Sequence, residues 1–175
     1  MNIQSMGRCL LLAATVTLAA CATSPAPQVS ADAVTVQYAP DAWRDDLRKA
    51  SNESEAALRS TEQSLTRHIQ ERASRVLSEG QKLDVTFTHI ERAGSVEPWR
   101  GPSSYDVRIV RDIYPPRIDL TFRLLAADGS TLASGKRELR DLGFLSRTNM
   151  YSNDPLRYEK TLLDDWVRKE FPQSR

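Results

Sequence analysis

The chain has 175 residues, a formal net charge of +1 and two cysteines. Without residues 1–20 it loses Arg8 and one cysteine, which leaves 23 basic and 23 acidic residues and no global field that would attract nucleic acid. One remaining cysteine excludes an intrachain disulfide, and about 155 residues can bury enough surface for one domain.

The N-terminal segment, residues 1–20, has the charge and length of a targeting signal. After Arg8, the apolar run Cys9 to Ala20 is too short for a membrane span, which needs ~20 residues. The run ends in Leu18-Ala19-Ala20-Cys21, and with this ending the segment resembles a bacterial lipoprotein signal peptide with its lipobox. The resemblance implies palmitate-type acylation at Cys21 and a membrane anchor, and Ala22 in the position of the retention aspartate favours an outer-membrane site facing the periplasm. The alternative is an ordinary secretory signal with a cysteine nearby.

Residues 21–33 are expected to form the lipidated cysteine and a flexible tether. The stretch Ala22 to Ala33 is small, polar and proline-containing, and as a flexible chain it spans roughly 20 Å. Residues 34–175 then make up a single globular domain. Its first element is a short strand at Val34 to Tyr38, and Trp43 and Leu47 tie the charged segment after it to the core.

A long helix is predicted near residues 53–79. Asn52 is the expected N-cap, with Glu55 three positions on, and Gly80 provides the C-terminal stop. The apolar residues recur at helical spacing. They are Leu58, Leu65, Ile69, Ala73 and Val76.

Two segments alternate between apolar and polar residues, as half-buried strands do. In the stretch from Leu83 to His89 the apolar residues are Leu83, Val85 and Phe87. In RIDLTFRLL, residues 117–125, they are Ile118, Leu120, Phe122 and Leu124. Asp128-Gly129 then predicts a hairpin turn, and a weaker strand returns over about residues 131–139.

The last predicted element is a helix that opens at Asp154-Pro155. Its expected inner stripe is Leu156, Leu163, Trp166 or Val167, and Phe171. The order of elements predicts an α+β fold: a two-layer sandwich with a mainly antiparallel sheet of four to five strands and two helices on one face.

The stretch VEPWRGPSSYDVRIVRDIYPPRID, residues 96–119, is the candidate binding segment. Pro115-Pro116 must interrupt any strand there. One interpretation is a set of solvated ion pairs on the sheet, each worth ~0–1 kcal/mol. The other is a rigid concavity for a carboxylate or phosphate, with aromatic walls and bidentate arginine donors. Its residues would be Trp99, Arg100, Tyr105, Arg111, Tyr114 and Arg117.

The sequence contains, in this order, the blocks EPWRGP at 97–102, RIVRDIYPPRIDL at 108–120, DPLRYEK at 154–160 and LLDDW at 162–166. Together they resemble the bacterial domain of unknown function 3016 family. The resemblance covers about residues 34–171. It implies a small envelope protein, often with a signal peptide, and carries no activity, cofactor or catalytic residue.

The sequence contains no HExxH, CxxC, GxSxG, P-loop or GxGxxG pattern. We therefore expect that the protein binds no metal or cofactor and is not an enzyme. The first hypothesis is a lipid-anchored, non-enzymatic binding or assembly module whose partner is an envelope protein or an anionic ligand. The alternative is a small envelope hydrolase that pairs His89 with a carboxylate such as Asp106 or Asp112. A hydrolase requires that pair to lie within hydrogen-bond reach in a cleft.

Overall fold

The computed structural model describes residues 33–49, 53–104, 107–148 and 150–172. The signal, Cys21 and most of the tether lie outside these ranges, as do Asn52, Tyr105 and Asp106. Within the described ranges, no helix combines the length and the apolar character that crossing a membrane requires.

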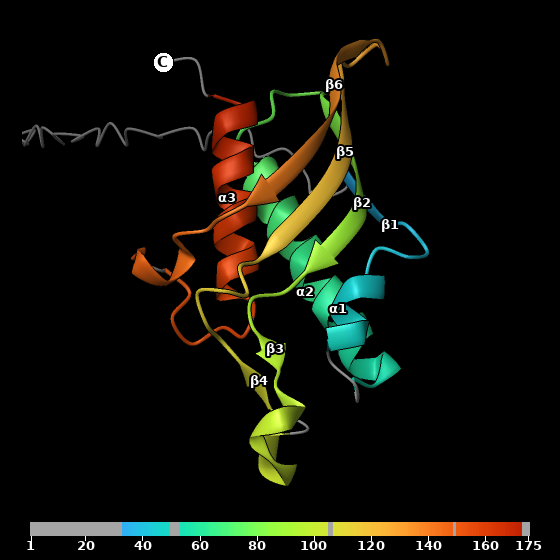
Figure 1. The fold of residues 1–175 in the computed structure, drawn as a ribbon. Coiled ribbons are helices and arrows are strands. Elements are labelled where there is room, and N and C mark those ends of the chain that lie inside the picture. Colours follow the sequence, from blue (N-terminus) through green and yellow to red (C-terminus); the bar gives the residue numbers. More distant parts are fainter. Residues whose placement is uncertain (1–32, 50–52, 105–106, 149, 173–175) are drawn as a thin grey trace, which may run out of the picture.

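A four-stranded sheet forms one layer of the domain (Figure 1). Its strands, in the order β1-β2-β5-β6, are β1 (Val34–Tyr38), β2 (Lys82–Glu91), β5 (Arg117–Leu125) and β6 (Thr131–Arg140). β1 runs parallel to β2, and the other pairs are antiparallel. Helices α2 (Glu55–Ala73) and α3 (Arg157–Glu170) cover one face, so the predicted α+β sandwich is confirmed.

The core lies between the sheet and these two helices. The alternation in the sequence places the expected side chains there: Leu83, Val85 and Phe87 from β2 and Ile118, Leu120 and Phe122 from β5 are buried. The helices contribute Leu65, Ile69, Leu162, Leu163, Trp166 and Val167. Removal of this apolar surface from water stabilises the fold by about 25 cal/mol per Å².

Helix α2 is shorter than predicted. Ser54 caps it by accepting a hydrogen bond from the amide three residues on, at 3.2 Å. The helix ends at Ala73, so the expected end near residue 79 was wrong. The amides of Val76 and Leu77 both donate to the carbonyl of Ala73, at 2.9 and 3.0 Å, in a closing turn where Leu77 is buried. Gly80, with φ of +78°, turns the chain into β2 instead of stopping the helix.

Two further elements differ from the prediction. The charged segment after β1 forms a short helix, α1 (Arg44–Lys49), which buries the side chain of Asp46. Helix α3 begins at Arg157, two residues later than expected, although Asp154 still accepts a hydrogen bond from the Leu156 amide at 2.8 Å. A 3-10 turn, η4 (Phe144–Ser146), precedes α3.

Strand β2 carries a bulge near its end. The pairing register with β5 shifts between Phe87 and His89, so one extra residue enters the strand. Before the bulge Phe87 faces the core, and after it Ile90 does. His89 and Glu91 therefore lie together on the outer face of the sheet, opposite the helices.

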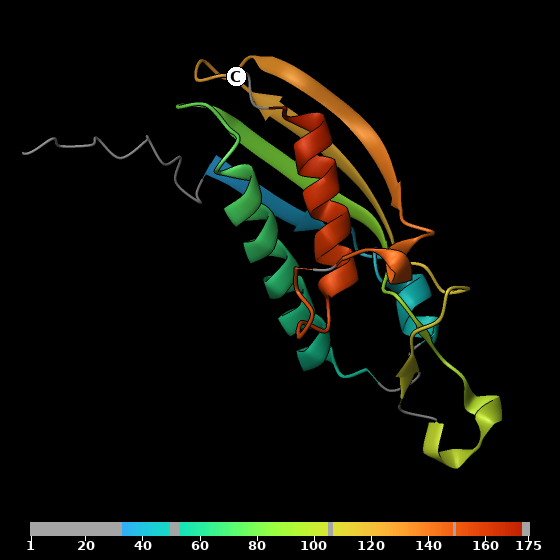
Figure 2. The ribbon, with the colours of Figure 1, turned by 90° about the vertical axis from the view of Figure 1, so that its left-hand side faces the viewer.

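An arm, residues 94–114, projects from the end of the sheet (Figure 2). It contains a two-stranded ribbon of β3 (Ser95–Val96) and β4 (Arg108–Ile109), and the 3-10 turns η2 (Pro98–Arg100) and η3 (Pro102–Ser104). Pro115-Pro116 separate the arm from β5, as the sequence predicts.

Candidate functional site

The base of the arm is fastened to the domain by a buried carboxylate. Asp46 of α1 is fully buried and accepts hydrogen bonds from the backbone N–H, Nε and Nη2 of Arg92 at 2.8, 2.9 and 2.7 Å. Arg108 of β4 reaches the same carboxylate at 3.1 Å and also donates to the Gly94 carbonyl at 3.0 Å. A charge buried in this way requires such partners. The arm is therefore fixed where it leaves the body.

A second buried carboxylate, Glu97, lies inside the arm. It accepts hydrogen bonds from Arg111 Nη1 at 3.1 Å, from Tyr114 Oη at 3.2 Å and from Arg100 Nε. Its side chain is 0 % exposed, covered by groups of the arm itself. Burial raises the pKa of Glu97, but the bonds from Arg111, Arg100 and Tyr114 outweigh it and hold that pKa below the usual value. Burial and the bond to Glu97 raise the pKa of Tyr114.

The structure therefore assembles three of the predicted site residues, but around an acidic group of the arm. Arg100, Arg111 and Tyr114 converge on Glu97. Arg117 lies outside this group, because its guanidinium donates to Asp119 at 3.0 and 2.6 Å. Tyr105 is outside the described residues.

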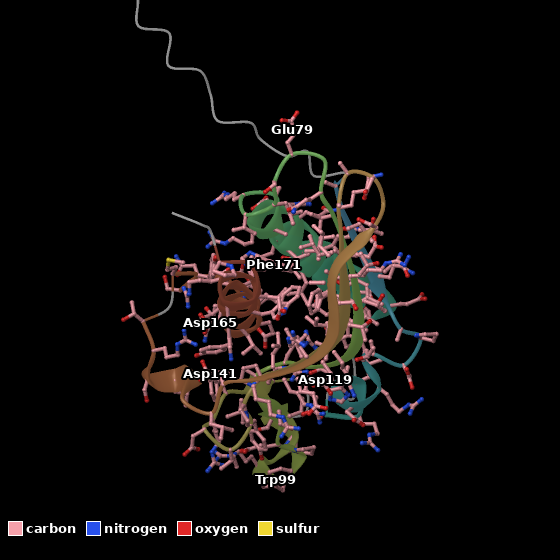
Figure 3. The ribbon with its side chains drawn as sticks, turned by 90° about the horizontal axis from the view of Figure 1, so that it is seen from above. Glu79, Trp99, Asp119, Asp141, Asp165 and Phe171 are labelled. Atoms are coloured by element: carbon pink, nitrogen blue, oxygen red, sulfur yellow. The ribbon has the colours of Figure 1, made fainter. Side chains whose placement is uncertain are left out.

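Trp99 lies at the tip of the arm. Its side chain is 73 % exposed, and Figure 3 shows it at the outer edge of the molecule, beyond the sheet and the helices. The arm also exposes Val107, Val110 and Ile113. Exposed apolar groups gathered on one projecting element mark interaction surfaces more often than isolated ones do.

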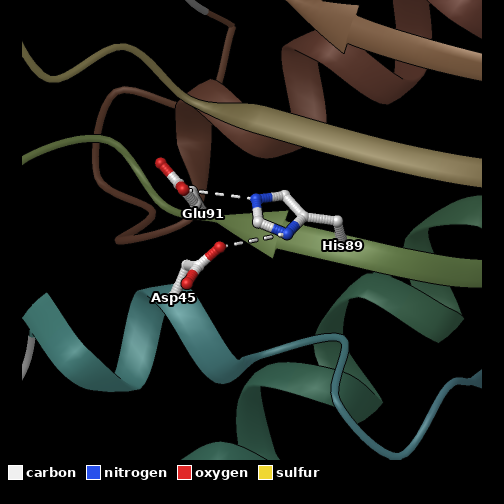
Figure 4. A group of neighbouring side chains, drawn as sticks. All are labelled: Asp45, His89 and Glu91. Atoms are coloured by element: carbon white, nitrogen blue, oxygen red, sulfur yellow. Dashed lines mark hydrogen bonds and ion pairs between the residues drawn. The ribbon is translucent and has the colours of Figure 1, made fainter.

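His89 lies between two carboxylates on the outer face of the sheet (Figure 4). Its Nε2 is 3.2 Å from Glu91 Oε1, and its Nδ1 is 3.7 Å from Asp45 Oδ2. These are not the partners that the sequence suggested. Asp106 is outside the described residues, and Asp112 accepts a hydrogen bond from the Ile113 amide at 3.0 Å. One ligand atom from each of the three residues lies within 4.8 Å of the other two, so a metal ion can be held here.

A cavity of about 660 Å³ lies along the helices α2 and α3. Asp164 organises one wall: it accepts hydrogen bonds from His68 Nε2 at 2.9 Å, Tyr151 Oη at 2.6 Å and Arg72 Nη2 at 3.1 Å. Burial raises the pKa of Asp164, but the bonds from His68 and Tyr151 outweigh it and lower that pKa. This network joins α3 to α2, and Arg72 and Arg168 lie in the last turns of the two helices, where cations are favoured.

Glu159 of α3 is a buried acid beside the base of the arm. Its Oε1 accepts a hydrogen bond from the Ala93 amide at 2.7 Å, and its Oε2 has no partner among the described residues. Burial raises the pKa of Glu159 above its usual value. In the sequence, Glu159 lies at helical spacing from Leu162 and Leu163, which are buried, and this spacing is a signal for its burial.

The comparisons with known proteins identify one family. The family model described as "Protein of unknown function (DUF3016)" matches residues 32–169. No curated protein matches the chain. Among solved structures, a minor lipoprotein from Acinetobacter baumannii is similar at 10% identity and a TM-score of 0.26, covering 84% of this chain and 90% of that one. A likeness this distant carries no argument about function.

Proposed function

Because the chain belongs to the DUF3016 family of proteins of unknown function, no activity comes with its membership, and we propose a function from its own residues. The protein is a lipoprotein anchored to the outer membrane through Cys21, with its domain in the periplasm. There it acts as a non-enzymatic binding or assembly module, and it contacts a partner protein through the arm, residues 94–114.

The single observation that supports this function most is the exposure of Trp99 on a braced arm. Trp99 is 73 % exposed, although tryptophan favours burial against other groups. Arg100 and Arg111 belong to the same arm, and about half of each side chain is exposed. Tryptophan, tyrosine and arginine are the residues that dominate binding energy at protein interfaces.

The shape of the arm favours a macromolecular partner over a small ligand. Small-molecule sites are concave and enclose most of their ligand. Trp99 instead projects outward, and the donors of Arg100 and Arg111 are directed at Glu97. A stiff projecting element loses little conformational entropy when a partner binds, which favours affinity.

A photoreactive group at position 99, in intact cells, tests the arm. We expect one predominant adduct there, and none of that mass with the group at Leu142, which is as exposed but lies after β6. Capture of the same partner should fall at least tenfold in Trp99→Ala and stay unchanged in Leu142→Ala. Equal capture by both variants would exclude the arm as the contact.

The anchor has its own test. Cys21→Ser removes the sulfur that accepts the lipid, and the tether after it is polar. We expect the variant to leave the membrane fraction and appear in the soluble periplasmic fraction, because acyl chains hold such proteins at ~0.8 kcal/mol per buried CH₂. A variant that stays in the membrane pellet would contradict the lipid anchor.

A second candidate function is hydrolysis, and the contact of His89 with Glu91 at 3.2 Å favours it. A histidine within hydrogen-bond reach of a carboxylate can act as a general base. If this function holds, hydrolysis of a p-nitrophenyl ester should be faster with the wild type than with His89→Gln. Equal rates would remove this candidate.

A further inference from the structure

We propose that Asp45, His89 and Glu91 form a site for a divalent transition-metal ion of the zinc type, a role separate from that of the arm. The sequence gives no sign of it, since the three residues match no metal-binding pattern. They meet only because α1 packs against the end of β2.

The donor set fits such an ion. Zinc accepts histidine nitrogen and carboxylate oxygen, and its non-structural sites typically use three protein ligands with water in the fourth position. Because one of the three donors is an imidazole nitrogen, the set differs from the all-oxygen sets that magnesium and calcium prefer. One donor atom from each of the three residues lies within 4.8 Å of the other two.

The spacing also fits. Tetrahedral bonds of about 2.0–2.1 Å place neighbouring ligand atoms roughly 3.3 Å apart. His89 Nε2 and Glu91 Oε1 are already 3.2 Å apart. Asp45 lies beside the other ring nitrogen, at 3.7 Å from Nδ1, so its side chain has to rotate toward the ion. Asp45 is in the short helix α1, and among the described residues it pairs with the exposed Arg48 and with His89.

The bulge in β2 is what places two of the ligands. The register shifts between Phe87 and His89, and the shift moves His89 and Glu91 to the same outer face. Bulges redirect side chains in this way and are frequent beside functional sites. Without the extra residue, the alternation that buries Phe87 would point His89 into the core.

The surrounding charges allow a cation to enter. Arg117 is opposite Glu91 in the sheet, but both nitrogens of its guanidinium facing Asp119 donate to that carboxylate, at 3.0 and 2.6 Å. The pair is close to neutral as a unit. Asp45 and Glu91 both face the imidazole, and a divalent ion bound there would attract both carboxylates, in competition with the exposed Arg48 that pairs with Asp45.

Calorimetric titration with Zn²⁺ alone tests the proposal, on the chain from residue 22 onward made without a histidine tag. We expect one bound ion per chain in the wild type. Removal of a ligand in His89→Gln, Glu91→Gln or Asp45→Asn should weaken binding by roughly 10–100-fold or more, since even outer partners of metal ligands are worth that much.

The matched control is Asp84→Asn, which removes a carboxylate from the same strand away from the site and should leave binding unchanged. A second readout is the melting temperature: Zn²⁺ should raise it in the wild type and in Asp84→Asn but not in the three site variants. Absence of binding in the wild type, or binding that survives in all three site variants, would overturn the proposal.

Discussion

Glu97 accepts hydrogen bonds from two arginines and a tyrosine, so its removal would leave two guanidinium groups facing each other without a counter-charge. The arginines look like free donors in the sequence because nothing there shows that Pro98 and the η2 turn direct Arg100 back onto Glu97. The same contacts that occupy these donors also stiffen the arm that carries Trp99.

Glu97→Ala should therefore loosen the arm without unfolding the domain. We expect faster amide hydrogen exchange at Val96 and Arg108, which pair β3 with β4, and unchanged exchange in β2 and β5. Glu138→Ala, which removes an exposed carboxylate of β6 that pairs with Lys136, is the control. Unchanged exchange in the arm would show that Glu97 does not brace it.

Glu159→Gln should change how stability depends on pH. Burial raises the pKa of Glu159 in the folded state, so between the ordinary glutamate pKa and the raised one the folded chain binds more protons than the unfolded chain. The contribution of Glu159 to the free energy of unfolding is complete below that window and decreases as pH rises through it. Urea unfolding should show a smaller decrease in the variant, which should be the more stable form at alkaline pH. Parallel curves would contradict the raised pKa.

At the scale of elements, the arm depends on a glycine where it leaves the body. Gly94 has φ of +87°, and a Cβ there would lie 2.8 Å from the Ile109 carbonyl oxygen. Any other residue at position 94 would strain the backbone, and its Cβ would clash with the Ile109 carbonyl. Gly129, in the β5–β6 turn, has a similar φ of +84° but no atom within 4 Å of such a Cβ.

These two glycines form a matched pair for a prediction. Both alanine variants should lose about 1–2 kcal/mol of unfolding free energy from the left-handed backbone. Gly94→Ala should lose about 1–3 kcal/mol more, because the Ile109 carbonyl has to move. Urea denaturation measures the difference. Equal losses would mean that the base of the arm can shift freely.

The elements that the sequence predicts well are those with a local signature. Phe87 and Phe122 are found in the core because alternation marks them, and the hairpin at Gly129 follows from Asp-Gly. The end of α2 is not local in this sense: Val76 and Leu77 both continue the helical spacing, yet the helix ends at Ala73, whose carbonyl accepts hydrogen bonds from both of their amides. Helix α1 is also missed, since a six-residue helix carries no periodicity.

The candidate site was predictable only in part, for the same reason. The composition around Trp99 marks the arm, but a buried partner such as Glu97 is visible only when the chain has folded. The contact between Asp45 and His89 joins residues that are far apart in sequence. The bulge that places His89 on the outer face depends on pairing with β5, which no stretch of β2 alone specifies.

At the scale of the whole molecule, the two ends of strand β2 lead to different parts of the protein. Val34 pairs with Leu83 at the start of β2, whereas the arm continues beyond Glu91 at its end (Figure 2). β2 has 10 residues, which at about 3.3 Å per residue is roughly 33 Å. Val34, where the described N-terminal part begins its first strand, and Trp99 therefore lie toward opposite ends of the sheet.

This arrangement gives a prediction about reach. A flexible chain of the length of residues 22–33 spans roughly 20 Å, so a domain held by the proposed anchor would place Trp99 well away from the membrane. Deletion of residues 23–31 should keep the protein in the membrane fraction but lower the adduct yield from a photoreactive group at position 99. A Gly-Ser stretch of equal length should restore the yield, because length and not sequence sets the reach. Full capture by the shortened form would place the partner at the anchoring membrane, and failure of the Gly-Ser stretch would mean that the tether residues themselves make contacts.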